Sequence, residues 1–163
     1  MKGHAGENPP KDVFVFVETT KDDRCKYVWD EKIEELFLKK VFERPSPTIY
    51  GHIPKTHIVS EKQLGCFVIT HGIIRPGTFV SCRPVGVVRT VNDAVVVDRL
   101  IAVAIGDKEN GNIKNLDTLS QSFKDDITKV LQIEGYKKIE FFDVDKAEKV
   151  VEHAIELYKR KYD

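Results

Sequence analysis

The sequence predicts a mainly β fold, a small barrel of strands followed by helices. Strand-like segments rich in β-branched and aromatic residues crowd the first two thirds of the chain, separated by turn signals. After the polar loop at residues 107–112, the apolar pattern changes from a period of about two to about 3.6. With 163 residues, the chain has room for one sizeable core. We therefore expect a single domain over residues 11–163, preceded by a flexible tail at residues 1–10.

The first strand is expected at Val13–Val17, where every residue is β-branched or aromatic, as in a strand buried on both faces. The stretch Pro45–Pro54 holds three prolines and Gly51. Because these residues interrupt strand pairing, the stretch is predicted to be an ordered loop that leaves Tyr50 free to face a cleft. Further strands are predicted at Lys26–Trp29, Leu36–Phe42, Cys66–Thr70, Thr78–Val88, Ala94–Val97 and Leu100–Ile105.

Two helices are expected in the last third of the chain. The first ends at Gly135 and has Ser120 or Ser122 available as its N-cap. A strand at Tyr136–Phe142 precedes the second helix, which begins near Asp145, where Asp145 and Glu148 resemble a capping box. Both helices carry one apolar face, which predicts core packing rather than a cofactor surface. These faces are Phe123, Ile127, Val130 and Leu131, then Ala147, Val150, Val151, Ala154, Ile155 and Tyr158.

The composition excludes several classes of protein. Hydrophobic residues make up 41% and charged residues 32%, as in a soluble globular protein. No apolar run approaches the roughly 18 to 20 residues that span a bilayer, and the start lacks a signal peptide's apolar core. We therefore expect a cytoplasmic protein with no membrane partner. A pI near 7.0 lacks the basic excess of a nucleic-acid-binding protein. The widely spaced Cys25, Cys66 and Cys82 predict reduced thiols rather than a disulfide framework.

The charges are unevenly distributed along the chain. In the segment Arg44–Asn92 the only acid is Glu61, against six bases. Such a segment predicts a site for phosphate or another anion, or equally a set of bases spread over a solvated surface. The same segment contains His52, His57 and His71. Their spacing matches no metal site known to us, so surface or hydrogen-bonded histidines are expected.

Several short motifs occur in an order that points to one family. They are Val17-Glu18, Lys26-Tyr27, Pro47-Thr48-Ile49-Tyr50-Gly51, Arg75-Pro76-Gly77-Thr78 and Cys82-Arg83-Pro84-Val85-Gly86-Val87. Over roughly Val13–Tyr158 the chain resembles soluble family I inorganic pyrophosphatases. The resemblance implies a five-stranded closed β-barrel of OB type with flanking helices. It also implies hydrolysis of pyrophosphate to two phosphates by a water that carboxylate-bound Mg²⁺ ions activate.

The resemblance assigns phosphate-binding roles to four side chains. Lys26 and Tyr50 stand at a phosphate-binding lysine and tyrosine, Lys40 stands where an arginine is usual, and Arg99 stands where a lysine is usual. Three acids remain as remnants of the metal ligands. Glu18 and Asp93 keep acidic positions, and Asp98 is one residue beyond another.

Most metal-binding aspartates of the family are missing from this chain. The signature Asp-x-Asp-x-x-Asp falls on residues 60–65, where Ser60, Lys62 and Gly65 stand instead. The three positions thereby change by roughly four charge units toward positive, where cations should bind. A later aspartate falls on Val97, and the neighbouring Asp98 should point to the opposite face, since strand side chains alternate. Valine replaces another acid at position 28, and a late tyrosine-lysine pair is deleted.

Two functions follow from these substitutions. The first is a catalytically degenerate pyrophosphatase, a pseudoenzyme that retains phosphate or pyrophosphate binding. The second is an active Mg²⁺-dependent enzyme with an unusual metal arrangement, for which Mg²⁺ would be the cofactor. Lys62 either takes the place of a cation in the cleft or extends into solvent. Because short family members commonly form hexamers and longer ones dimers, we expect a homo-oligomer, with the hexamer favoured. The second function would draw on Glu18, Glu61, Asp93 and Asp98.

Overall fold

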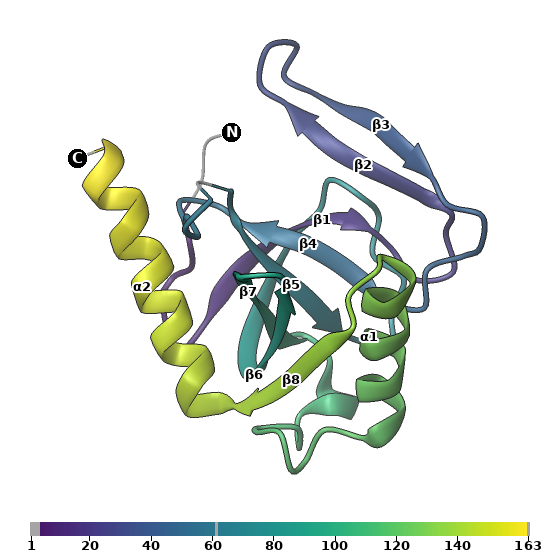
Figure 1. Ribbon diagram of the computed structural model, residues 1–163, viewed down its shortest axis with the longest axis vertical. Coiled ribbons are helices and arrows are strands. Elements are labelled where there is room, and N and C mark those ends of the chain that lie inside the picture. The colour runs from purple at the N-terminus through teal and green to yellow at the C-terminus, as the bar shows by residue number, and fades with distance from the viewer. Residues whose placement is uncertain (1–3, 61, 163) are drawn as a thin grey trace.

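The computed structural model describes residues 4–60 and 62–162, and within them eight strands, two α-helices and one short 3₁₀ helix. Figure 1 shows their arrangement. The strands are β1 (Val13–Thr19), β2 (Cys25–Asp30), β3 (Glu35–Val41), β4 (Ile49–Ile53), β5 (Leu64–Ile69), β6 (Phe79–Asn92), β7 (Val95–Ala104) and β8 (Lys138–Asp143). The helices are η1 (Lys108–Asn110), α1 (Gln121–Ile133) and α2 (Val144–Tyr162).

Five of the strands pair in a ring. The order is β1-β4-β5-β7-β6, and β6 pairs with β1 to close it. All neighbours in the ring are antiparallel except β5 and β7, which are parallel. The long strand β6 also pairs with β8, so the C-terminal part of the chain is attached to the ring through that strand. The predicted mainly β fold is confirmed at this level.

The two faces of the ring strands belong to two separate cores. On β1, Val13, Val15 and Val17 are fully buried and share a cluster with α2, which contributes Ala147, Val151 and Ala154. The alternate face of the strands packs against α1 in a second cluster. Because strand side chains alternate, the two faces of the ring strands are buried in different cores, and each core includes one of the two α-helices. The apolar stripes predicted for the two helices are confirmed in this role.

The predicted loop at Pro45–Pro54 is wrong, because Ile49–Ile53 forms β4 between β1 and β5. The prolines of this stretch all lie outside the strand, so none of them interrupts the ladder. Gly51 lies opposite Val17, and a Cβ atom at this position would overlap the Phe16 carbonyl. A glycine that appears to break the strand is therefore the residue that permits its close approach to β1.

Other boundaries also differ from the prediction. The two strands expected at Ala94–Val97 and Leu100–Ile105 form the single strand β7, which pairs with β6 along its whole length. Helix α1 begins after Ser120, whose hydroxyl accepts the Phe123 amide, as predicted. Gly135 follows its end with φ at +98°.

The start of α2 does not use the predicted capping box. The helix begins one residue before Asp145, and the carboxylate of Asp143 accepts the amide of Val144 at 2.7 Å. The same carboxylate oxygen accepts the Leu116 amide at 3.0 Å. Asp143 thereby joins the start of α2 to the loop that precedes α1, and these hydrogen bonds lower the pKa of Asp143.

Strands β2 and β3 form a separate two-stranded hairpin that projects from the ring (Figure 1). One of its faces touches the ring. Trp29 packs edge-on against Phe16 with ring centroids 6.1 Å apart, and Leu36 lies against Gly77. Since an isolated hairpin is marginally stable in water, these contacts hold it in place.

The N-terminal segment contacts the first core, and the three cysteines are free thiols. The flexible tail at residues 1–10 stays a prediction, although Ala5 is buried in the first core and its carbonyl accepts the Phe14 amide at 2.7 Å.

Cys25, Cys66 and Cys82 are free thiols, and burial raises the pKa of Cys82 to about 12. Within the described residues, neither helix is long and apolar enough to span a bilayer.

Candidate functional site

The candidate site lies on the α1-facing side of the ring, where β4, β5 and β7 meet. On β4, Ile49, Gly51 and Ile53 are buried, while Tyr50 and His52 point to the other face. Strand alternation brings both side chains to one surface, together with Gly65 of β5 and Arg99 of β7. Three strands, β4, β5 and β7, therefore contribute to one surface.

Tyr50 fills the space that a side chain at Gly65 would occupy. A Cβ atom built on Gly65 would overlap the Tyr50 hydroxyl and lie 2.7 Å from its ring carbon Cζ. The phenol ring also packs against Phe67 with centroids 4.8 Å apart. This position of Tyr50 and an acidic side chain at position 65 therefore exclude one another.

Arg99 lies beside Tyr50 and has only neutral partners. Its Nη1 donates to the Thr90 hydroxyl at 3.0 Å, and its Nη2 donates to the Tyr136 hydroxyl at 3.1 Å. The guanidinium carbon lies 5.0 Å from the Tyr136 ring centroid. No carboxylate of residues 4–60 or 62–162 forms an ion pair with Arg99. The site therefore holds a half-buried positive charge without a negative partner.

Burial and neighbouring groups together set the pKa values of Tyr50 and Arg99. It raises the pKa of the Tyr50 phenol to about 12, against the opposing effect of the Arg99 charge. For Arg99, burial lowers the pKa, but Tyr50 and Tyr136 raise it by more, so its pKa is raised overall. Near neutral pH the site thus presents the Arg99 guanidinium beside the neutral phenol of Tyr50.

Glu18, which was predicted to be a remnant metal ligand, lies at this surface and already has a partner. Its buried carboxylate bonds to Nδ1 of His52, the neighbour of Tyr50 on the same face of β4. The His52 ring meets the Tyr50 ring edge-on, with centroids 5.5 Å apart. The His52 imidazole therefore occupies the position beside the Glu18 carboxylate oxygen that a metal ion would need.

The other predicted metal ligands lie elsewhere. Asp98 forms two hydrogen bonds to Arg89, at 2.8 and 3.1 Å, on the face of the β6–β7 ladder opposite Val97. Asp93 is exposed in the turn between β6 and β7, with φ at +53°. Glu61 lies outside the described residues. The structure therefore separates Asp93 and Asp98 from the surface that carries Glu18.

The predicted phosphate-binding lysines do not contact Tyr50 or Arg99. Lys26 and Lys40 lie directly opposite one another in the β2–β3 hairpin. Lys62 and Ser60 are exposed in the loop before β5, where the Lys62 carbonyl accepts the Ile58 amide at 2.8 Å. The predicted phosphate-binding residues thus lie in three places: Tyr50 and Arg99 on the ring, Lys26 and Lys40 on the hairpin, and Lys62 in the loop before β5.

The family is decided by comparison with known proteins. The family model described as inorganic pyrophosphatase matches residues 15–159. The chain belongs to the inorganic pyrophosphatase family. It is 29% identical over 166 residues to the inorganic pyrophosphatase of Haloferax volcanii, covering 96% of this chain and 94% of that protein. It is 30% identical over 146 residues to the enzyme named so in Neisseria meningitidis serogroup B, with 83% and 82% covered.

Solved structures agree with this assignment. The inorganic pyrophosphatase of Helicobacter pylori superposes with a TM-score of 0.85 at 25% identity, covering 98% of this chain and 99% of that one. The inorganic phosphatase of Anaplasma phagocytophilum superposes with a TM-score of 0.84 at 27% identity, with 96% and 98% covered. The similarity therefore extends over nearly the whole chain.

The family is magnesium-dependent, and the described residues do not fit such a centre. Mg²⁺ prefers carboxylate oxygens in near-octahedral geometry. Within residues 4–60 and 62–162, no group of three or more His, Cys, Asp or Glu side chains could hold a metal ion. Glu18 bonds to His52, and Gly65 lacks a side chain. We derive no catalytic step through Mg²⁺ at this surface.

Two residues of the site were missed in the sequence. His52 is two residues from Tyr50, so it would have been placed on the same face if residues 49–53 had been interpreted as a strand. Tyr136 directly follows the glycine that ends α1, and its hydroxyl reaches Arg99 over a separation of 37 residues. No local pattern in the sequence indicates that contact. The deletion of the family's late tyrosine-lysine pair was, however, a reason to look for another phenol in this region.

Proposed function

We propose that this chain is a pyrophosphatase-family protein that has lost Mg²⁺-dependent hydrolysis and binds phosphate or pyrophosphate without a metal. The observation that supports it best is Arg99, a half-buried guanidinium whose partners are all neutral hydroxyl groups. A partly buried charge without a counter-charge is destabilised, and a bound anion would supply the missing charge. The proposed anion ligands are Lys26, Lys40, Tyr50, Lys62 and Arg99.

Loss of hydrolysis is supported by the acids that remain. Hydrolysis in this family requires a water whose pKa is lowered by metal ions, and the metals require carboxylates that converge. Here Glu18 is bonded to His52, and Asp98 is bonded to Arg89 on the opposite face of its ladder. The residues at positions 60, 62 and 65 supply no carboxylate.

The alternative is an active Mg²⁺-dependent inorganic pyrophosphatase. The comparisons support this function better than the degenerate one, because the curated relatives carry the enzyme's name over nearly their full length. It would require Glu18 to release His52 and to act with Glu61, Asp93 or Asp98. In such a metal centre the carboxylates would have to converge, whereas in the structure Glu18, Asp93 and Asp98 lie apart.

A phosphate-release assay separates the two functions. Purified protein is incubated with pyrophosphate and Mg²⁺, beside a metal-free control containing EDTA. We expect negligible release in both, while a turnover above about 1 per second, within the usual range of enzymes, would establish the alternative. Calorimetric titration with pyrophosphate in EDTA is then expected to show binding, and no heat of binding would contradict the anion-binding proposal.

Three further properties belong to the same proposal. The five-strand ring is a closed barrel of OB type, which the ring pairing and the family support. The chain forms a homo-oligomer, a hexamer in preference to a dimer, and acts in the cytoplasm. Light scattering tests the assembly, and a monomer of 18.6 kDa across micromolar concentrations would contradict it.

A further inference from the structure

His52 has one ring nitrogen bonded to an acid and a second ring nitrogen that is open. Its Nδ1 is bonded to the buried carboxylate of Glu18, and an ionised carboxylate only accepts hydrogen bonds, so Nδ1 carries the proton. In the neutral ring Nε2 then holds a lone pair. Within residues 4–60 and 62–162 no hydrogen bond or ion pair to Nε2 is found, and the His52 side chain is 24% exposed. The nitrogen that can act as a nucleophile is therefore accessible.

This nitrogen is turned toward the part of the ring that carries Arg99. Glu18 lies on β1, and the two nitrogens are on opposite sides of the imidazole, so Nε2 is directed away from β1. On that side of β4 the next strands are β5 and β7. His52 pairs with Gly65 of β5, and Arg99 is the neighbour of Gly65 on β7, because the residues that follow them are paired. The three residues thus form a row across three strands, with backbones about 10 Å apart at its ends.

Gly65 leaves the centre of this row without a side chain of its own, and the Tyr50 hydroxyl lies there. Burial raises the pKa of this hydroxyl to about 12, so it keeps its proton near neutral pH and can donate a hydrogen bond. At the far end of the row Arg99 has only neutral hydroxyl partners. A phosphoryl group above Gly65 would therefore meet a nucleophilic nitrogen, a hydroxyl donor and a guanidinium.

We infer that His52 is a nucleophile that takes a phosphoryl group from pyrophosphate without a metal ion. Nε2 attacks one phosphorus atom, an N–P bond forms, and the bond from that phosphorus to the bridging oxygen breaks. The bridging oxygen keeps the electron pair and leaves as part of inorganic phosphate, which water protonates. Arg99 and Tyr50 bind the oxygens of the transferred group. Nδ1 keeps its proton, and the Glu18 carboxylate stabilises the positive charge that develops on the imidazole.

The inference rests on the proposed binding of pyrophosphate at Arg99 and Tyr50, and it adds a reaction at that site. This transfer differs from hydrolysis, because water does not attack phosphorus and one phosphate at most is released per chain. It is also reversible, since inorganic phosphate can attack the phosphohistidine and form pyrophosphate again. The phosphohistidine can therefore be a small fraction of the protein and still be detected through repeated exchange.

Isotope exchange tests the transfer. Protein is incubated in EDTA with unlabelled pyrophosphate and labelled inorganic phosphate, and we expect label to enter pyrophosphate without net release of phosphate. Exchange by reversible hydrolysis would instead be accompanied by net release. His52→Gln should lose the exchange, and Arg99→Met should slow it roughly a hundredfold, as removal of a donor to transition-state charge does. His153→Gln is the matched control, because His153 is exposed on α2, which packs in the other core.

Two further measurements address His52 and Glu18 separately. Peptide mass spectrometry of wild-type protein quenched at alkaline pH, where phosphohistidine survives, should place the phosphoryl group on His52. Nitrogen NMR of the His52 ring should show a protonated Nδ1 and an unprotonated Nε2. In Glu18→Ala the proton should move to Nε2 and the exchange should be lost, which identifies Glu18 as a positioning residue. Circular dichroism checks that the variants are folded.

Each outcome decides the inference. Wild-type protein that binds pyrophosphate in EDTA but shows no exchange overturns the inference and leaves the proposed function standing. Wild-type protein that shows neither binding nor exchange overturns both. Exchange that persists in His52→Gln, or a phosphoryl group mapped to another residue, overturns the assignment of His52 as the nucleophile. An unchanged ring tautomer in Glu18→Ala overturns the role of Glu18.

Discussion

The hydroxyl of Tyr50 occupies the volume into which a side chain at Gly65 would project. The resemblance to the family's signature motif predicts an aspartate at this position, so glycine here would both remove a carboxylate and leave room for a phenol. The phenol then lies beside Arg99, whose remaining partners are the hydroxyls of Thr90 and Tyr136. The expected loss of a metal ligand and the proposed anion site would therefore be coupled at a single backbone position.

Substitution of Gly65 is expected to destabilise the protein through overpacking. In Gly65→Ala the new methyl group overlaps the Tyr50 side chain, which is itself held against Phe67, so the free energy of unfolding falls by about 1 to 3 kcal/mol. Urea denaturation measures the change. Gly72→Ala is the control, since a Cβ atom there lies no closer than 3.8 Å to its neighbours. Equal stability of the two variants would contradict the position assigned to Tyr50.

Anions are expected to stabilise the fold without metal. Millimolar pyrophosphate in EDTA should raise the melting temperature, because a ligand that binds only the folded state stabilises it. Arg99→Met should lose most of the rise, since it removes the uncompensated charge and keeps an apolar side chain of similar length. Lys62→Ala should reduce the rise in part. An unchanged rise in Lys62→Ala would place that ammonium in solvent, and an unchanged rise in Arg99→Met would contradict the site.

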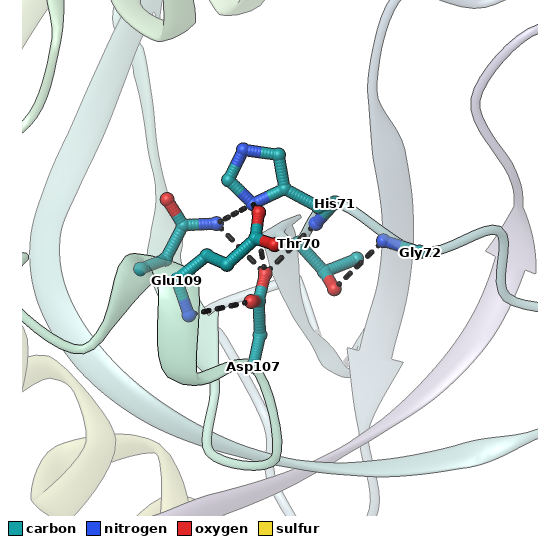
Figure 2. Close-up of polar contacts among 6 residues, drawn as sticks. Thr70, His71, Gly72, Asp107 and Glu109 are labelled. Atoms are coloured by element: carbon teal, nitrogen blue, oxygen red, sulfur yellow. Dashed lines mark hydrogen bonds and ion pairs between the residues drawn. The ribbon is translucent and has the colours of Figure 1, made fainter.

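Acid stability should depend on Asp107, which anchors the loop after β5. Figure 2 shows its carboxylate accepting the His71 amide, while the Asn110 side chain also donates to it, each at 2.8 Å. These bonds, led by the His71 amide, lower the pKa of Asp107 from 3.8 to about 2. Because the folded pKa lies below the unfolded one, this stabilisation is present above pH 4 and is lost as the pH falls toward 2.

Urea midpoints at pH 5 and pH 2.5 check this prediction. Asp107→Asn should be less stable than wild type at pH 5 and should lose less stability between the two pH values. Asp117→Asn is the control, because no hydrogen bond to the exposed Asp117 side chain is found within residues 4–60 and 62–162; this variant should respond to acid as wild type does. A wild-type acid response in Asp107→Asn would show that these hydrogen bonds do not favour the charged form.

Asp98 is expected to contribute to stability and not to a metal response. Asp98→Ala breaks a two-point bond to Arg89, whose guanidinium also lies 4.8 Å from the Phe142 ring centroid, and should cost about 1 kcal/mol. Glu156→Ala, which breaks an exposed pair with Arg160, should cost less. Thermal melts of both variants with and without Mg²⁺ should show the same response to the metal as wild type. A Mg²⁺ effect lost only in Asp98→Ala would instead support the active enzyme.

Local patterns in the sequence were sufficient for much of the fold. The strand at Val13–Val17, the Ser120 cap and the apolar faces of both helices follow from side-chain periodicity and capping chemistry, which act over a few residues. The opposite placement of Val97 and Asp98 likewise follows from strand alternation alone. The motifs around Cys82–Val87 added the family, and the comparisons confirmed it.

The site itself was decided by tertiary structure. In the sequence, Gly51 indicates an interruption of the strand. In the structure, Gly51 packs closely against the Phe16 backbone and is part of β4, so His52 shares a face with Tyr50. The bond from His52 to Glu18 joins residues 34 apart, and the bond from Arg99 to Tyr136 joins residues 37 apart. The sequence determined which carboxylates were missing. The groups that now surround Arg99 and Glu18 depend on which strands are neighbours. The reason is that a buried charge interacts with groups that are close in space, whatever their separation along the chain.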